Sequence, residues 1–199
     1  MSIVFATEPA GSRVALAEGL SALGAAATPT SAAHFAAVSG AAAAPPLPVY
    51  FFSLDELAAG RDPRNVSPVA WKYLLVCGSV PVRSADVMSS ANGGFEFAAI
   101  SEAEAAAINN AIETAESDPL LANHDYELRL ALIPALYVTA LWLKDTKQGQ
   151  DRFVVIPPTP SGFIAFSIHT AADFLKALQT AAMQKQRSAP AQMGMSPTN

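Results

Sequence analysis

Cysteine and charge are scarce in this chain of 199 residues, which has Cys77 as its single cysteine and only 15% charged residues. One cysteine excludes an intrachain disulfide, and a thiolate zinc site would need other ligands. The apolar neighbours in Leu74-Leu-Val-Cys-Gly78 predict a small, buried and unreactive thiol. The reducing cytoplasm is therefore the expected compartment.

Basic clusters and long apolar runs are also missing. The 12 Lys and Arg are scattered singly and the net charge is −5, so the composition argues against nucleic-acid binding. The longest apolar run, Leu130 to Leu143, is shorter than the about 20 residues of a membrane-spanning helix. Residues Met1 to Ala6 carry no basic side chain, so we expect neither a secretion signal nor a transmembrane segment.

Motifs of catalysis are absent as well. Neither Gly-x-Ser-x-Gly nor a phosphate-binding glycine loop occurs, and Asn92-Gly-Gly94 precedes an expected strand rather than a helix. His124 is the only histidine next to a carboxylate residue, Asp125, and this isolated pair is too little to predict a metal centre. We therefore expect no catalytic residue, no metal and no cofactor.

What the sequence does contain is a set of three helix-start signatures, each after a short apolar run. They are Ser53-x-x-Glu56, Ser101-x-x-Glu104 and Thr170-x-x-Asp173. In such a capping box the hydroxyl accepts a hydrogen bond from the third helical N–H. Asp173 is shorter than Glu, so the third signature is the weakest of the three.

Periodicity predicts both strands and helices. Strands are expected at residues 2–5, 49–52, 71–77, 80–87, 95–100, 126–144, 153–156 and 163–168, and helices at 12–23, 54–59, 101–117 and 170–185. The fold class is α+β: an antiparallel sheet of about six strands between residues 49 and 168, with the helices at 101–117 and 170–185 packed on one face.

The segment Tyr126 to Lys144 has two interpretations. Its composition fits a long strand, whereas its leucines nearly follow helical spacing. Pro134 would cost about 3 kcal/mol in the middle of a helix, so a strand with a bulge or bend at Pro134 is favoured. Pairing with residues 153–156 then places Leu141 in the core and Trp142 on an outer face, toward solvent or a second subunit.

Composition divides the chain into three parts. Residues 1–48 form an arm rich in Ala and Pro, with a short helix possible at 31–38. Residues 49–187 form a single α+β domain. Residues 188–199 contain no periodic apolar stripe and are expected to be disordered.

Aromatic side chains recur in the expected strands, where core packing is their common role. The alternative is a ligand or interface surface. The candidates for it, together with nearby polar anchors, are Trp71, Tyr73, Arg83, Arg129, Tyr137, Trp142 and His169.

The function favoured by these observations is a noncatalytic interaction or assembly protein that self-associates or binds a protein partner. High apolar content, 51% of residues, and ends rich in small residues support it. The alternative is a small-molecule-binding protein or an enzyme with a pocket between the sheet and the helices.

Overall fold

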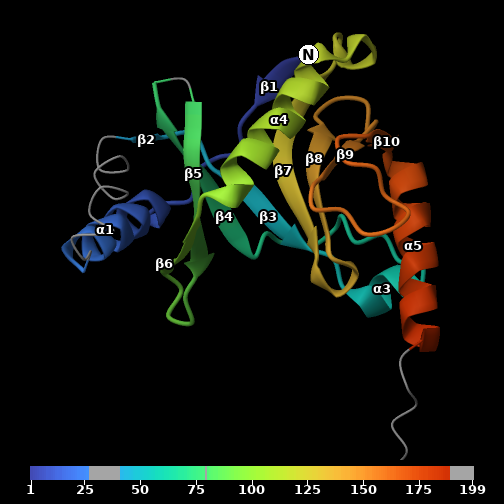
Figure 1. Ribbon diagram of the computed structural model, residues 1–199, viewed down its shortest axis with the longest axis horizontal. Coiled ribbons are helices and arrows are strands. Elements are labelled where there is room, and N and C mark those ends of the chain that lie inside the picture. Colours follow the sequence, from blue (N-terminus) through green and yellow to red (C-terminus); the bar gives the residue numbers. More distant parts are fainter. Residues whose placement is uncertain (27–40, 79, 189–199) are drawn as a thin grey trace, which may run out of the picture.

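The computed structural model describes residues 1–26, 41–78 and 80–188, which form one large sheet with helices on both faces (Figure 1). The strands are β1 (Ser2–Val4), β2 (Ala42–Ala43), β3 (Leu47–Phe51), β4 (Ala70–Cys77), β5 (Val80–Ser89), β6 (Phe95–Ser101), β7 (Asp125–Ile133), β8 (Val138–Asp145), β9 (Arg152–Ile156) and β10 (Ile168–Thr170). The helices are α1 (Ser12–Ala25), α3 (Leu54–Ala58), α4 (Ala103–Ser117) and α5 (Ala171–Ser188). The helix expected at 31–38 and nearly all of the expected tail lie outside the described residues.

The sheet is larger than predicted and mixed rather than antiparallel. Its ten strands follow the order β10-β9-β8-β7-β3-β4-β5-β6, with β1 beside β7 and β2 beside β4. Both β1 and β3 pair with β7 in parallel, through registers such as Val49 opposite Leu130. The expectation of about six antiparallel strands is therefore wrong. A parallel pair joins segments far apart in sequence, so no local turn signal announces it.

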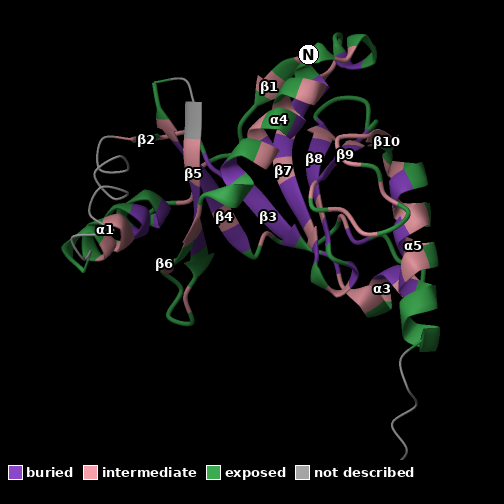
Figure 2. Cartoon of the chain, in the orientation of Figure 1, coloured by how far each residue is buried: buried purple, intermediate pink, exposed green. Residues whose placement is uncertain are grey.

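The two main helices lie on opposite faces of the sheet, which corrects the prediction that they share one. Ala105, Ile108 and Ala111 of α4 pack in one buried cluster with Leu141. Phe174 and Leu178 of α5 pack on the other face, in a cluster with the β8 and β9 aromatics. Figure 2 shows the buried residues concentrated in the central strands between these layers. Both faces need a cover because β7 and β8 carry apolar side chains on both.

The segment predicted as one bent strand is a hairpin with its turn at Pro134. A short 3₁₀ turn, Pro134–Leu136, links β7 to β8, and Tyr137 follows with a φ of 55°. Antiparallel pairing of β8 with β9 agrees with the predicted pairing of these segments.

The faces of β8 alternate as predicted, but the exposure of Trp142 is not as predicted. Leu141 belongs to the cluster beneath α4, and Trp142 belongs to the cluster on the opposite face. The Trp142 side chain is 0% exposed and its ring stacks on Phe153, which in turn stacks on Phe174 of α5. The expectation of an outward Trp142 is therefore wrong, because α5 covers this face.

Of the three capping boxes, only the weakest forms a cap with its side chain. The backbone N–H of Asp173 donates to Thr170 Oγ1 at 3.1 Å, and that hydroxyl donates to Asp173 Oδ2 at 2.7 Å. Ser53 caps α3 without a side-chain hydrogen bond. Ser101 ends β6 instead of capping α4, which leaves the side chain of Glu104 available for another contact.

The exposure of Cys77 also differs from the prediction, since the thiol is exposed rather than buried. Cys77 is the last residue of β4 and is followed by Gly78, which has a φ of 66°. The register of β4 and β5 shifts between Leu75 and Val76. The end of β4 thus extends beyond the buried cluster that holds Leu75, and local apolar composition does not reveal this.

The first strand and helix of the predicted N-terminal arm pack on the sheet. β1 pairs with the first residues of β7, and α1 covers the face of β5 and β6 opposite to α4. Gly19 lies where α1 crosses β6, and a Cβ placed there would overlap the side chain of Phe97. The division of the chain at residue 48 stays a prediction.

Replacing Gly19 by Ala is expected to destabilise the protein by about 1–2 kcal/mol. Overpacking costs about 1–3 kcal/mol, which exceeds the gain in helix propensity of at most about 1 kcal/mol. Gly24→Ala in the same helix is the control, because no described atom lies within 4 Å of the added Cβ. Chemical denaturation should show opposite signs for the two variants, and stabilisation by Gly19→Ala would contradict the close approach of α1 to β6.

Candidate functional site

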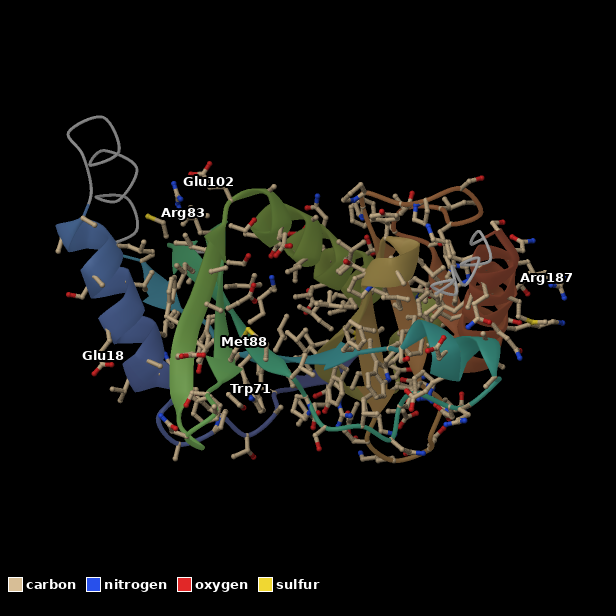
Figure 3. All side chains as sticks on the ribbon, turned by 90° about the horizontal axis from the view of Figure 1, so that it is seen from below. Glu18, Trp71, Arg83, Met88, Glu102 and Arg187 are labelled. Carbon is tan, nitrogen blue, oxygen red and sulfur yellow. The ribbon has the colours of Figure 1, made fainter. Side chains whose placement is uncertain are left out.

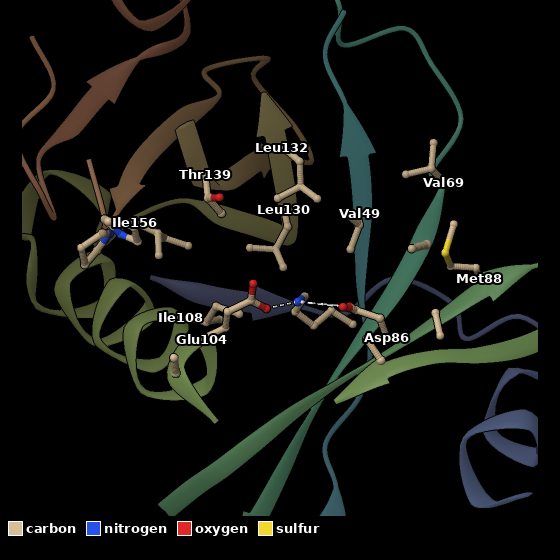
Figure 4. Close-up of a pocket in the computed structure, with 17 residues that line it drawn as sticks. Val49, Val69, Asp86, Met88, Glu104, Ile108, Leu130, Leu132, Thr139 and Ile156 are labelled. Carbon is tan, nitrogen blue, oxygen red and sulfur yellow. Dashed lines mark hydrogen bonds and ion pairs between the residues drawn. The ribbon is translucent and has the colours of Figure 1, made fainter. Parts of the chain in front are cut away.

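A cavity of about 380 Å³ lies on the α4 face of the sheet, beside the N-terminal half of α4 (Figure 4). Residues of each strand from β3 to β9 contribute to its wall, together with residues of α4 and of the segment after β9. Most of the wall is apolar, with major contributions from Val49, Met88, Ile108, Leu130, Leu132 and Ile156. The cavity exists because α4 covers only part of this face.

Three charged side chains meet at one end of the cavity. Lys72 of β4 is only 5% exposed, and its Nζ donates to Asp86 Oδ2 of β5 at 3.1 Å and to Glu104 of α4. The hydroxyl of the buried Ser84 also lies 3.5 Å from Glu104 Oε2. Figure 4 shows Asp86 and Glu104 on either side of the lysine ammonium. This pairing offsets part of the cost of burying the charge.

Asp86 is not fully satisfied by this arrangement. Its Oδ1 lies 3.1 Å from Lys72 Nζ, yet the atom is buried and makes no hydrogen bond. Burial raises the pKa of Asp86, while the charge and hydrogen bond of Lys72 oppose that rise. A buried carboxylate oxygen with spare accepting capacity is costly unless a donor reaches it.

None of these three residues is among the site candidates predicted from the sequence. The spacing Ser101-x-x-Glu104 predicts a helix cap for Glu104, and Lys72 lies next to Trp71 without belonging to a motif. A usable signal was the alternation in β4, which places Lys72 on the same face as Ala70 and Leu74. Lysine is rarely buried, so an inward Lys between two apolar residues marks a position where partners must converge.

The seven residues predicted for a ligand or interface surface lie elsewhere in the structure, and none belongs to the wall of the cavity. Arg129 and Trp142 come together, because the guanidinium lies 4.8 Å from the indole centroid and 5.0 Å from the ring of Tyr50. Glu127 accepts a hydrogen bond from Arg129 Nε at 2.6 Å. This group lies on the face opposite to the cavity.

The other five predicted residues are dispersed over the molecule. Tyr73 is buried and its hydroxyl lies 2.6 Å from Ser12 Oγ, while Trp71 packs against the same cluster beneath α1. Arg83 pairs with Glu102 near the start of α4 (Figure 3).

Tyr137 is 76% exposed at the turn between β7 and β8. His169 Nε2 lies 2.8 Å from Ser167 Oγ in the segment before α5. A functional role for any of the seven predicted residues stays a prediction.

Trp142 is held by a polar network at the β8–β9 loop. Asp151 is 1% exposed and accepts hydrogen bonds from Trp142 Nε1 at 2.9 Å, from Arg64 Nη1 at 3.2 Å and from the Asp145 backbone N–H at 3.1 Å. Because its oxygens have several donors, this carboxylate fixes the loop and is not available to a ligand.

Asp145 organises the same loop from the other side. Its carboxylate accepts from the backbone N–H groups of Lys147 and Gln148 at 2.8 Å and lies 3.2 Å from His124 Nδ1. Burial by itself raises the pKa of Asp145, but the hydrogen bonds from the backbone of Gln148 and Lys147 and from His124 outweigh it and hold the pKa at about 2.

The described part of the chain holds neither a metal-binding cluster nor a membrane-spanning helix. Residues 1–26, 41–78 and 80–188 contain no group of three His, Cys, Asp or Glu side chains placed to hold a metal ion. Among the same residues, no helix combines the length and the apolar character needed to cross a membrane.

Comparison with known proteins adds no relative. No family model matches the chain, and neither a curated protein nor a solved structure shows a significant match. The function therefore has to be inferred from the site itself.

Asp145→Asn is expected to lower the free energy of unfolding at pH 7 by about 1–3 kcal/mol, the cost of weakened hydrogen bonds to a charged group. The folded-state pKa of about 2 lies below the ordinary 3.8, so this contribution is complete above pH 3.8 and is lost as the pH falls through 2. Urea unfolding from pH 7 to pH 2 should show the two proteins converging. Glu116→Gln, on the exposed side of α4, is the control, and a constant difference down to pH 2 would contradict the depressed pKa.

Proposed function

We propose that the protein binds a small, largely apolar molecule in the cavity between α4 and the sheet. The observation that carries this proposal is the convergence of Lys72, Asp86 and Glu104 at one end of an otherwise apolar wall. Small-molecule sites are concave and mostly apolar, with a few polar groups that orient the ligand. The role expected in the sequence analysis as an alternative is thus the one that the geometry favours.

The size and accessibility of the cavity support binding. A volume of about 380 Å³ falls in the range of about 300–1,000 Å³ that is typical of ligand sites. The rim includes Val69 and Met88, each of which is 43% exposed. An apolar ligand would remove these side chains from water, and burial contributes about 25 cal/mol for each Å² of apolar surface.

Binding is favoured over catalysis by the composition of the wall. Its polar side chains are those of Lys72, Asp86, Glu104 and Thr139, with neither cysteine nor histidine among the wall residues. Lys72 contacts both carboxylates, and no separate nucleophile and base face each other across the cavity wall. The wall therefore offers a place to hold a molecule and one end to orient it.

The purified protein is expected to bind N-phenyl-1-naphthylamine, a neutral apolar fluorophore, with an increase in its emission. Ala99→Trp should weaken this binding about tenfold or more, because Ala99 is an exposed residue of the cavity wall and an indole there occupies the space of the ligand. A fluorescence titration measures both dissociation constants.

The matched control is Ala106→Trp, which adds the same side chain at an exposed position of α4 outside the cavity wall. Its affinity for the fluorophore should equal that of the wild type. Equal loss in both variants, or emission that never saturates, would contradict binding in this cavity. Native mass spectrometry of the purified protein tests in addition for a molecule that copurifies.

We propose self-association as a second candidate function, favoured by the exposed apolar rim formed by Val69 and Met88. A second copy could cover this rim instead of a ligand. Light scattering should then report a mass above that of the monomer, and Met88→Glu should restore the monomer by placing a charge in the contact. Leu120→Glu, at a residue that is 82% exposed and does not belong to the cavity wall, is the control and should leave the mass unchanged. A monomeric mass at all concentrations would contradict this candidate.

A further inference from the structure

The charges at the polar end of the cavity do not balance. Asp86 and Glu104 each bring one carboxylate, while Lys72 brings the one ammonium that contacts them. Among the wall residues of the cavity there is no second basic side chain. The polar end therefore has an excess of one negative charge beside a wall that is mostly apolar.

The Asp86 oxygen that makes no hydrogen bond indicates where a ligand group would bind. Asp86 Oδ1 is buried and makes no hydrogen bond although it lies 3.1 Å from Lys72 Nζ, whereas Oδ2 of the same carboxylate accepts from Lys72 Nζ at 3.1 Å. An ionised carboxylate can only accept hydrogen bonds, so a ligand group that binds Asp86 Oδ1 has to be a hydrogen-bond donor. A charged donor forms the stronger hydrogen bond.

A ligand with a carboxylate or phosphate fits this end poorly. It would have to approach Lys72, which already contacts two carboxylates, and would place a third negative charge beside them. A negative charge this close to two carboxylates is repelled by them. A neutral hydroxyl would avoid the repulsion but would leave the excess negative charge uncompensated. A cation on the ligand removes both problems.

We propose that the ligand is an amphiphilic amine, which places its apolar body against Leu130, Leu132 and Ile156 and donates from its ammonium to Asp86 Oδ1. This inference rests on the proposed function, since it specifies the chemistry of the molecule bound in the same cavity. Lys72 then acts as a positioning residue that holds the Asp86 and Glu104 carboxylates toward the ligand.

The test compares three molecules with the same chain and different head groups: octylamine, 1-octanol and octanoate. Each displaces N-phenyl-1-naphthylamine from the wild-type protein at pH 7 and constant ionic strength. Octylamine should compete at least about tenfold more strongly than 1-octanol, and octanoate should compete least. This comparison requires no variant, so a folding defect cannot obscure it.

Asp86→Asn then tests the contact itself. The variant should lose the preference for octylamine over 1-octanol while it still binds the fluorophore. Glu18→Gln is the control for the loss of one negative charge, because Glu18 lies on the exposed side of α1 at the far end of the molecule (Figure 3). The preference for octylamine should be unchanged in Glu18→Gln.

The outcomes separate the two proposals. Equal or stronger competition by 1-octanol or octanoate overturns the amine while the cavity remains a binding site. An unchanged preference in a folded Asp86→Asn overturns the amine as well. Failure of the wild type to bind the fluorophore or any of the three molecules overturns the proposed function together with the inference.

Discussion

Burial of the β7–β8 hairpin on both of its faces is the constraint on which the other layers depend. Leu130 and Leu141 lie beneath α4, while Ala140 and Trp142 lie beneath α5. The apolar side chains on both faces of the hairpin have to be removed from water, so each face requires its own covering layer. α5 and α3 fill one side, but α4 covers only part of the other, and the uncovered part becomes the cavity. The cavity is therefore a consequence of how the hairpin is buried.

Much of the secondary structure could be predicted because its signals are local. The strand Phe153–Ile156 lies within β9, and the helix predicted from Thr170 begins one residue later as α5. Pro134 marked the position where the long apolar segment turns. What composition could not supply was the parallel pairing of Val49 with Leu130, because that contact depends on the whole intervening chain and not on neighbouring residues.

The candidate site was harder to predict than the fold, and Glu104 shows why. Its position three residues after Ser101 is typical of a capping box, but in the structure its carboxylate contacts Lys72. A buried ammonium gains more from a partner than a helix end that water can reach. Sequence spacing reports the local use of a side chain, whereas its tertiary use depends on which strands lie opposite. Lys72 and Asp86 become neighbours only through the pairing of β4 with β5.

The position of β1 has a consequence for the order in which the sheet is completed. Ser2 pairs with Asp125 and Val4 with Glu127, so the strands β2 to β6 lie between β1 and its partner in the sequence. On a ribosome, β1 stays without its neighbour until β7 has been synthesised, although β4, β5 and β6 can already pair with one another. Contacts of such long sequence separation form slowly. Completion of the sheet at β1 therefore waits for the synthesis of β7, and until then the unpaired β1 must avoid other partners.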